Sequence, residues 1–151
     1  MEYAGDDLAL GAIRRLNGSQ QDVSDSLARG TDRKDSWTKL VRDRLALLLE
    51  LPPGWDGYEG RKPSNQAVLF TMQFLAGSWR PRLPVPDISP MSDGGLLIEW
   101  TGEDAELTIE VSAPYDVRVS YEEDGEINEA VLGNDFSRLE TFLDLYVQAI
   151  Q

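Results

Sequence analysis

The chain has 151 residues, a formal net charge of −13, 41% hydrophobic residues, and neither cysteine nor histidine. Without cysteine there is no disulfide, thiolate zinc site or thiol nucleophile, and without histidine the commonest general base is missing. We therefore expect a non-enzymatic protein with no cofactor and no metal site. The N-terminus MEYAGDDLALG is acidic where a secretory signal is basic, and no apolar run is long enough to span a membrane, so we expect a cytoplasmic protein.

Residues 1–35 show the weakest periodicity of the chain. The polar sequence NGSQQ follows directly after a short set of apolar residues at helical spacing: Leu8, Ala9, Ala12, Ile13 and Leu16. We predict a poorly ordered or short-helical N-terminal extension over residues 1–35, in which residues 17–35 form a polar linker. Residues 36–151 are predicted to form a single α+β domain.

Two helices are predicted next. Ser36 caps the first, which must stop before Pro52 and Pro53 and has an apolar face spaced at three and four residues: Trp37, Leu40, Val41, Leu45, Leu48 and Leu49. The second runs from Pro63 or Ser64 to Gly77 and is apolar over more than one side. Such a helix is typically well buried.

Strands follow after a proline-rich segment. Prolines at 81, 84, 86 and 90 exclude a central strand and predict an extended crossing or an edge segment. Apolar and polar residues then alternate over 96–100, 105–111 and 117–122, which predicts three half-buried strands, and 126–132 is a less regular fourth. A last helix is capped by Asn134 or Asp135. The predicted fold is a two-layer α+β domain with an antiparallel four-stranded meander covered by helices, in the order α-α-β-β-β-β-α.

The negative charge is concentrated in the second half of the chain. Residues 1–98 hold 13 acidic and 12 basic side chains, a net −1, whereas residues 99–151 hold 14 acidic and two basic ones, a net −12. Because alternate strand residues share a face, Glu99, Glu106, Glu110 and Glu122 should project from one side of the sheet. We predict that these four, together with Glu123, Asp124 and Glu126 near the hairpin EEDGE, bind a partner.

A loop rich in turn-forming residues, LPPGWDGYEGRKPS, joins the two predicted helices and holds two large aromatic residues, Trp55 and Tyr58. In one interpretation both rings fold back into the core and Asp56 bonds loop amides. In the other, part of the aromatic pair stays exposed as an anchor for a partner, since Trp and Tyr dominate binding hot spots. We include both rings among the predicted binding residues.

The sequence GWDGY, the KPS that opens a helix, the proline-rich stretch and GGLLIEW together resemble a recurrent group of small bacterial and phage-associated proteins. These share a GWDGYG-like loop ahead of a Gly-Gly strand that ends in Glu-Trp. The resemblance covers residues 51–111, and this chain has Glu59 where the loop more often continues with glycine. It implies a mobile-element or defence-related setting and assigns no site.

These observations favour an acidic, antitoxin-like or anti-defence inhibitor that occupies a basic nucleic-acid-binding or catalytic surface of a protein partner. The negative surface predicts no direct binding of nucleic acid or membrane, and a homodimer is left open. A secretion-chaperone-like or adaptor protein is the first alternative. A metal-dependent enzyme is the second, although SYEEDGEINEAV lacks the carboxylates that a calcium loop needs at its first and twelfth positions.

Overall fold

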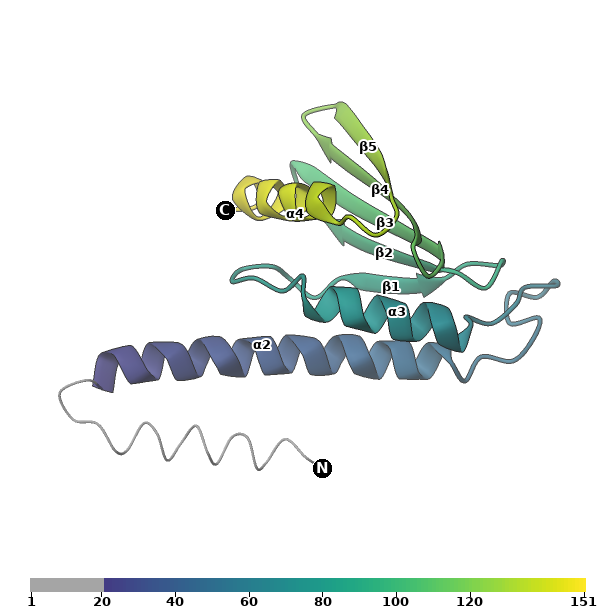
Figure 1. The fold of residues 1–151 in the computed structure, drawn as a ribbon, viewed down its shortest axis with the longest axis horizontal. Helices are drawn as coiled ribbons and strands as arrows, with labels where there is room; N and C mark the ends of the chain where they lie inside the picture. Colours follow the sequence, from purple (N-terminus) through teal and green to yellow (C-terminus); the bar gives the residue numbers. More distant parts are fainter. Residues whose placement is uncertain (1–20) are drawn as a thin grey trace.

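The computed structural model describes residues 21–151, which form two layers, an antiparallel sheet and helices packed on one of its faces (Figure 1). Helices α2 (Gln21–Leu48) and α3 (Asn65–Ala76) precede strands β1 (Asp87–Pro90), β2 (Leu96–Thr101), β3 (Ala105–Ala113), β4 (Asp116–Glu123) and β5 (Glu126–Leu132). Helix α4 (Ser137–Ala149) ends the fold. The predicted α+β class and antiparallel meander are confirmed.

The sheet has five strands in the order β1-β2-β3-β4-β5. The prediction of four strands was therefore one too few. The added strand is β1, which lies at the edge and pairs Ile88 with Ile98 of β2. It belongs to the proline-rich segment for which an edge position was one expectation. Four residues that end in a proline are too short to show alternation, which is why sequence periodicity missed the strand.

Helix α2 begins at Gln21, so the prediction of a polar linker as far as residue 35 is wrong from residue 21 onward. Apolar periodicity reports which side of a helix is buried, not where the helix starts. Residues 21–35 contain no proline, and a helix nucleated at its buried end can extend backward with one new hydrogen bond per residue. The short helix predicted over residues 8–16 lies outside the described residues.

The domain boundary stays a prediction, and truncation tests it. Removing residues 1–35 is expected to leave a cooperatively folded domain, because the buried residues of α2 within its described side chains begin at Trp37. Removing residues 1–20 alone is the milder control, since it leaves α2 whole. Thermal unfolding checks both, and a broad, non-cooperative transition for the shorter chain would show that the boundary is misplaced.

The core lies between the helices and one face of the sheet. Burial alternates along β2, β3 and β4, and the buried set includes Leu96, Ile98, Leu107, Ile109, Val117 and Val119. Helix α4 lies against β3 and β4, and α2 packs beside α3 and against β1. The indole Nε1 of Trp37 in α2 and that of Trp100 in β2 both donate to the Pro84 carbonyl oxygen, at 2.9 and 2.8 Å. The proline-rich segment thus ties α2 to the sheet.

The predicted ends of α3 agree with the structure, and the predicted start of α4 agrees less well. Ser64 caps α3, where its hydroxyl oxygen accepts the Ala67 N–H at 3.1 Å, and Gly77 ends that helix as predicted. Helix α4 starts at Ser137, one or two residues later than the predicted cap implies. The Asp135 carboxylate nevertheless accepts the Ser137 N–H at 3.0 Å, and this bond lowers the pKa of Asp135. The N-cap position is occupied by Phe136, which makes no side-chain capping bond, so the predicted cap at Asn134 or Asp135 is wrong, although Asp135 still bonds the first residue of the helix.

Candidate protein-binding surface

The face of the sheet that points away from the helices, here called the open face, is strongly acidic. Residues 87–132 hold 13 acidic side chains and one basic side chain, Arg118, a net charge of −12. The strand register places these carboxylates on the open face: Asp87, Glu99, Glu106, Glu110, Glu122 and Glu129. The prediction that Glu99, Glu106, Glu110 and Glu122 share one side of the sheet agrees with this register.

Acidic residues on the open face lie directly opposite one another. Glu106 of β3 is paired with Glu122 of β4, and Asp87 of β1 is paired with Glu99 of β2. Opposed residues in an antiparallel pair have Cβ atoms about 4.5–5.5 Å apart, and like charges at that distance are destabilising. Glu110 instead lies opposite Arg118. The register therefore sets two pairs of like charges opposite each other on the open face.

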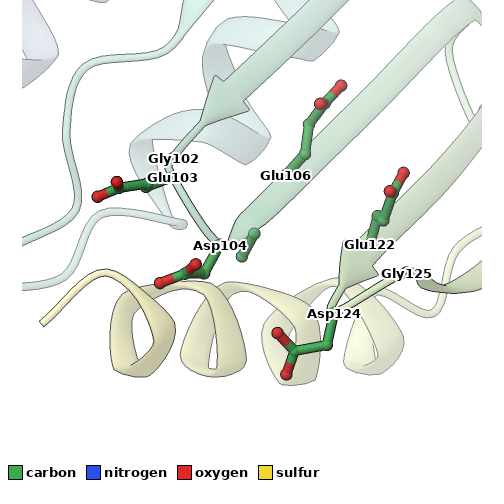
Figure 2. A pocket seen from close by; sticks show the side chains of 8 residues that line it. Gly102, Glu103, Asp104, Glu106, Glu122, Asp124 and Gly125 are labelled. Carbon is green, nitrogen blue, oxygen red and sulfur yellow. The ribbon is translucent and has the colours of Figure 1, made fainter.

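A shallow acidic hollow lies where β2 and β3 join, beside the tip of the β4–β5 hairpin. Its volume is about 250 Å³, and it is lined by Gly102, Glu103, Asp104, Ala105, Glu106, Glu122, Asp124 and Gly125. Figure 2 shows the side chains of Glu106 and Glu122 running parallel and away from α4, whereas Glu103 and Asp124 point elsewhere. Five of the eight lining residues come from the two turns, so the hollow widens the acidic area beyond the strands.

Three of the acidic residues predicted to bind the partner do not join the open face. Successive strand residues point to opposite faces, so Glu123 and its cross-strand partner Glu126 lie on the helix side of the sheet. Glu123 accepts a hydrogen bond of 2.5 Å from the Tyr121 hydroxyl. Burial, and then this bond, raise the pKa of Tyr121 above its ordinary value. Asp124 is at the hairpin tip and has a positive φ of 54°.

Two acidic residues of the open face, Asp87 and Glu129, were not predicted from the sequence. Asp87 could not be placed without β1, which pairs it with Glu99. Glu129 lies in β5, whose open-face residues Ile127, Glu129 and Val131 alternate with Asn128 and Ala130. That period of two was present in the sequence, but its apolar members are on the solvent side, which made the strand look irregular.

The loop with the two aromatic residues is held by Asp56. Its carboxylate accepts the backbone N–H of Tyr58 and of Gly60, both at 3.0 Å, and the Ser92 hydroxyl at 2.8 Å. The bond from Tyr58, followed by that from Ser92, lowers the pKa of Asp56. The predicted bonding of loop amides by Asp56 is therefore confirmed, and Ser92 adds a link to the β1–β2 turn.

The two rings of this loop differ in exposure. Trp55 is half-buried and its Nε1 donates to the Arg61 carbonyl oxygen at 2.9 Å, whereas Tyr58 is 86% exposed. The interpretation that both rings enter the core is wrong for Tyr58. The loop packs against Ser92 at one end of β2, and the acidic hollow includes Gly102 beyond the other end. Tyr58 and the hollow are therefore not one site.

The role of Asp56 predicts a pH-dependent effect for Asp56→Ala. Because hydrogen bonds lower the pKa of Asp56 in the folded state, its carboxylate contributes fully above the ordinary value of 3.8 and loses this contribution as the pH falls through the lowered value. The variant should be less stable than the parent at neutral pH, and the difference should narrow in acid. Urea unfolding across this range, with Glu59→Ala as the exposed control, measures it. A difference that stays constant with pH would contradict the role assigned to the carboxylate.

Comparisons with protein-family models, with curated proteins and with solved structures found no match to this chain. Among residues 21–151, no helix is both long and apolar enough to cross a membrane. Within the same part of the chain, no three acidic side chains are grouped so that they could hold a metal ion.

Proposed function

We propose that the protein binds a basic surface of a protein partner through the open face of its sheet, and so acts as an antitoxin-like or anti-defence inhibitor. The observation that carries the proposal is the opposition of Glu106 to Glu122 and of Asp87 to Glu99. A chain that needs charge only for solubility can scatter it. Opposed carboxylates reduce stability, so a partner that neutralises them gives a reason to keep them.

The partner surface that fits best is one that binds nucleic acid. A sheet holds its strands about 4.8 Å apart, so the open face presents an array of negative charges on a rigid frame. Basic clefts that accept phosphates are suited to such an array, and the field of the open face would speed the encounter. The inhibitor would then block the cleft by occupying it.

Capture from the host tests this proposal. The parent protein, immobilised and exposed to an extract of host cells, is expected to bind a basic protein. Added nucleic acid should compete for that basic protein and reduce the amount bound. A variant with glutamine in place of Glu106 and Glu122 should bind less of the basic protein than the parent does. Equal retention by the two proteins, with no competition by nucleic acid, would contradict the proposal.

Equal retention by the two proteins would favour an adaptor role instead. One feature of the structure supports that role. An apolar groove runs between α2 and the proline-rich segment, and its lining includes Trp37, Leu40, Trp79, Leu83 and Val85. Leu40 is 54% exposed there. A groove of this kind is suited to an apolar segment of a client and does not depend on the open face.

A further inference from the structure

The two edges of the sheet differ in how they are covered. At the β1 edge, Arg44 of α2 donates from Nε to the Ile88 carbonyl oxygen at 2.9 Å, and β1 is only four residues long with Pro90 at its end. These features block further pairing. At the other edge, no strand of the described residues pairs with the outer side of β5. Figure 1 shows β5 at the margin of the sheet, beyond the strands that α4 covers.

Among the devices that usually protect an edge, strand β5 has only charged side chains, those of Glu126 and Glu129. It has seven residues with no proline, lysine or arginine, and its pairing with β4 runs without a bulge. Five of the seven residues are exposed. Two of these are apolar side chains on the open face, with Ile127 60% and Val131 75% exposed. A regular edge without proline or bulge, and with exposed apolar residues, is a template for an added strand whose charge complements the two glutamates.

The register identifies which backbone groups are available. Asp124 and Gly125 have φ values of 54° and 83°, as in a two-residue type I′ turn, and Glu123 pairs with Glu126 across it. Such a turn closes on a hydrogen-bonded pair, and bonded and non-bonded pairs then alternate along the hairpin. The backbone groups of Ile127, Glu129 and Val131 therefore point away from β4. These are also the residues whose side chains lie on the open face.

We propose that β5 takes up an extended segment of the partner as a sixth, antiparallel strand. This inference rests on the proposed function and specifies how the basic partner is held. Residues of the segment directly opposite Ile127, Glu129 and Val131 have side chains on the open face. The matching segment is therefore apolar, basic and apolar at alternate positions, with its lysine or arginine opposite Glu129. Main-chain hydrogen bonds supply affinity, and the alternate side chains supply specificity.

A second copy of this chain fits the edge poorly. If β5 paired with itself over its full length in the antiparallel sense, Glu129 at the centre would lie opposite Glu129 of the other copy. Like charges directly opposite are destabilising, and each sheet also carries the net charge of −12 counted above over residues 87–132. Charge complementarity thus favours a basic segment of another protein.

A synthetic peptide tests the inference on the full chain. The probe is a nine-residue peptide with valine, lysine and valine at the three central alternate positions and threonine elsewhere. NMR titration should show the largest shifts at the amides of Ile127, Glu129 and Val131. N-methylation of the peptide amides that face β5 should weaken binding about tenfold or more, whereas methylation of the intervening amides should matter less, because only the former lose hydrogen bonds to the edge.

Charge exchange tests the register. Glu129→Lys should weaken binding of the lysine-centred peptide and strengthen binding of the same peptide with a central glutamate. Asn128→Lys is the matched control, since its side chain lies on the other face of β5. Ile127→Pro should also block binding, and it removes only an outward N–H, which an edge strand tolerates.

Two results would overturn the inference. One is binding that is unaffected by methylation of the facing amides, and the other is a peptide preference that Glu129→Lys does not change. Failure of the peptide to bind at all would also reject edge pairing. None of these results bears on whether the captured partner depends on Glu106 and Glu122, so the proposed function is judged separately.

Discussion

We expect association with the basic partner to slow by about tenfold or more at low salt when glutamine replaces four residues of the open face, Glu99, Glu106, Glu110 and Glu122. The variant should keep its fold. Surface charges act mainly on the association rate, because their field guides the encounter before contact forms. The same field is screened by ions over a Debye length of about 8 Å at physiological ionic strength. The salt dependence of the rate should therefore flatten in the variant. Stopped-flow or surface-binding kinetics from low to high salt measure both effects.

A matched pair of double variants separates local from total charge. Glu106→Gln with Glu122→Gln removes two opposed carboxylates, whereas Glu50→Gln with Glu59→Gln removes two exposed carboxylates elsewhere. Net charge changes equally in both. Only the first pair should slow association, and it should leave stability unchanged or slightly higher because a repulsive pair is relieved. Equal slowing by both pairs would mean that total charge, not the open face, controls binding.

Trp100→Ala is expected to lower the free energy of unfolding by about 3–5 kcal/mol, the usual range for a large aromatic residue deleted from a core. Trp100 is 2% exposed and donates its Nε1 proton to the Pro84 carbonyl oxygen. Domains of this kind are stable by only about 5–15 kcal/mol, so a large part of the total would be lost. Urea unfolding followed by circular dichroism gives the difference.

Tyr58→Ala is the control for the loss of an aromatic ring. Its side chain is 86% exposed, and exposed substitutions usually change stability by less than about 0.5 kcal/mol. A loss for Trp100→Ala as small as that of the control would show that the ring is not an essential part of the core.

Alternation made most of the sheet predictable from the sequence. In β2, β3 and β4 every second residue is buried, so both the strands and the shared side of Glu99, Glu106 and Glu110 follow from a period of two. The opposition of Glu106 to Glu122 depends on register, which the turn geometry sets and which alternation does not specify. Glu123 was predicted to bind the partner from near the hairpin, but it lies on the helix side of the sheet, because adjacent strand residues point to opposite faces.

Features that depend on contacts between distant segments were beyond the sequence. Strand β1 is defined by its pairing with β2, and the loop at Asp56 is fixed in part by Ser92, which is 36 residues away. The start of α2 was missed for a different reason, because helical propensity without an apolar face gives little signal over residues 21–35. Local patterns thus predicted elements, and tertiary contacts decided their limits.

The shared acceptor at Pro84 links the two layers thermodynamically. Proline has no N–H, so at this position the main chain can only accept, and its carbonyl oxygen has a lone pair for each indole. If the proline-rich segment left its place while α2 stayed docked, the buried indole N–H of Trp37 would lose its acceptor, and an unpaired buried donor costs about 1–3 kcal/mol. We therefore expect α2 to dock, and the proline-rich segment to order along β2, in one coupled step. The coupling depends on a single carbonyl oxygen that belongs to no helix and no strand.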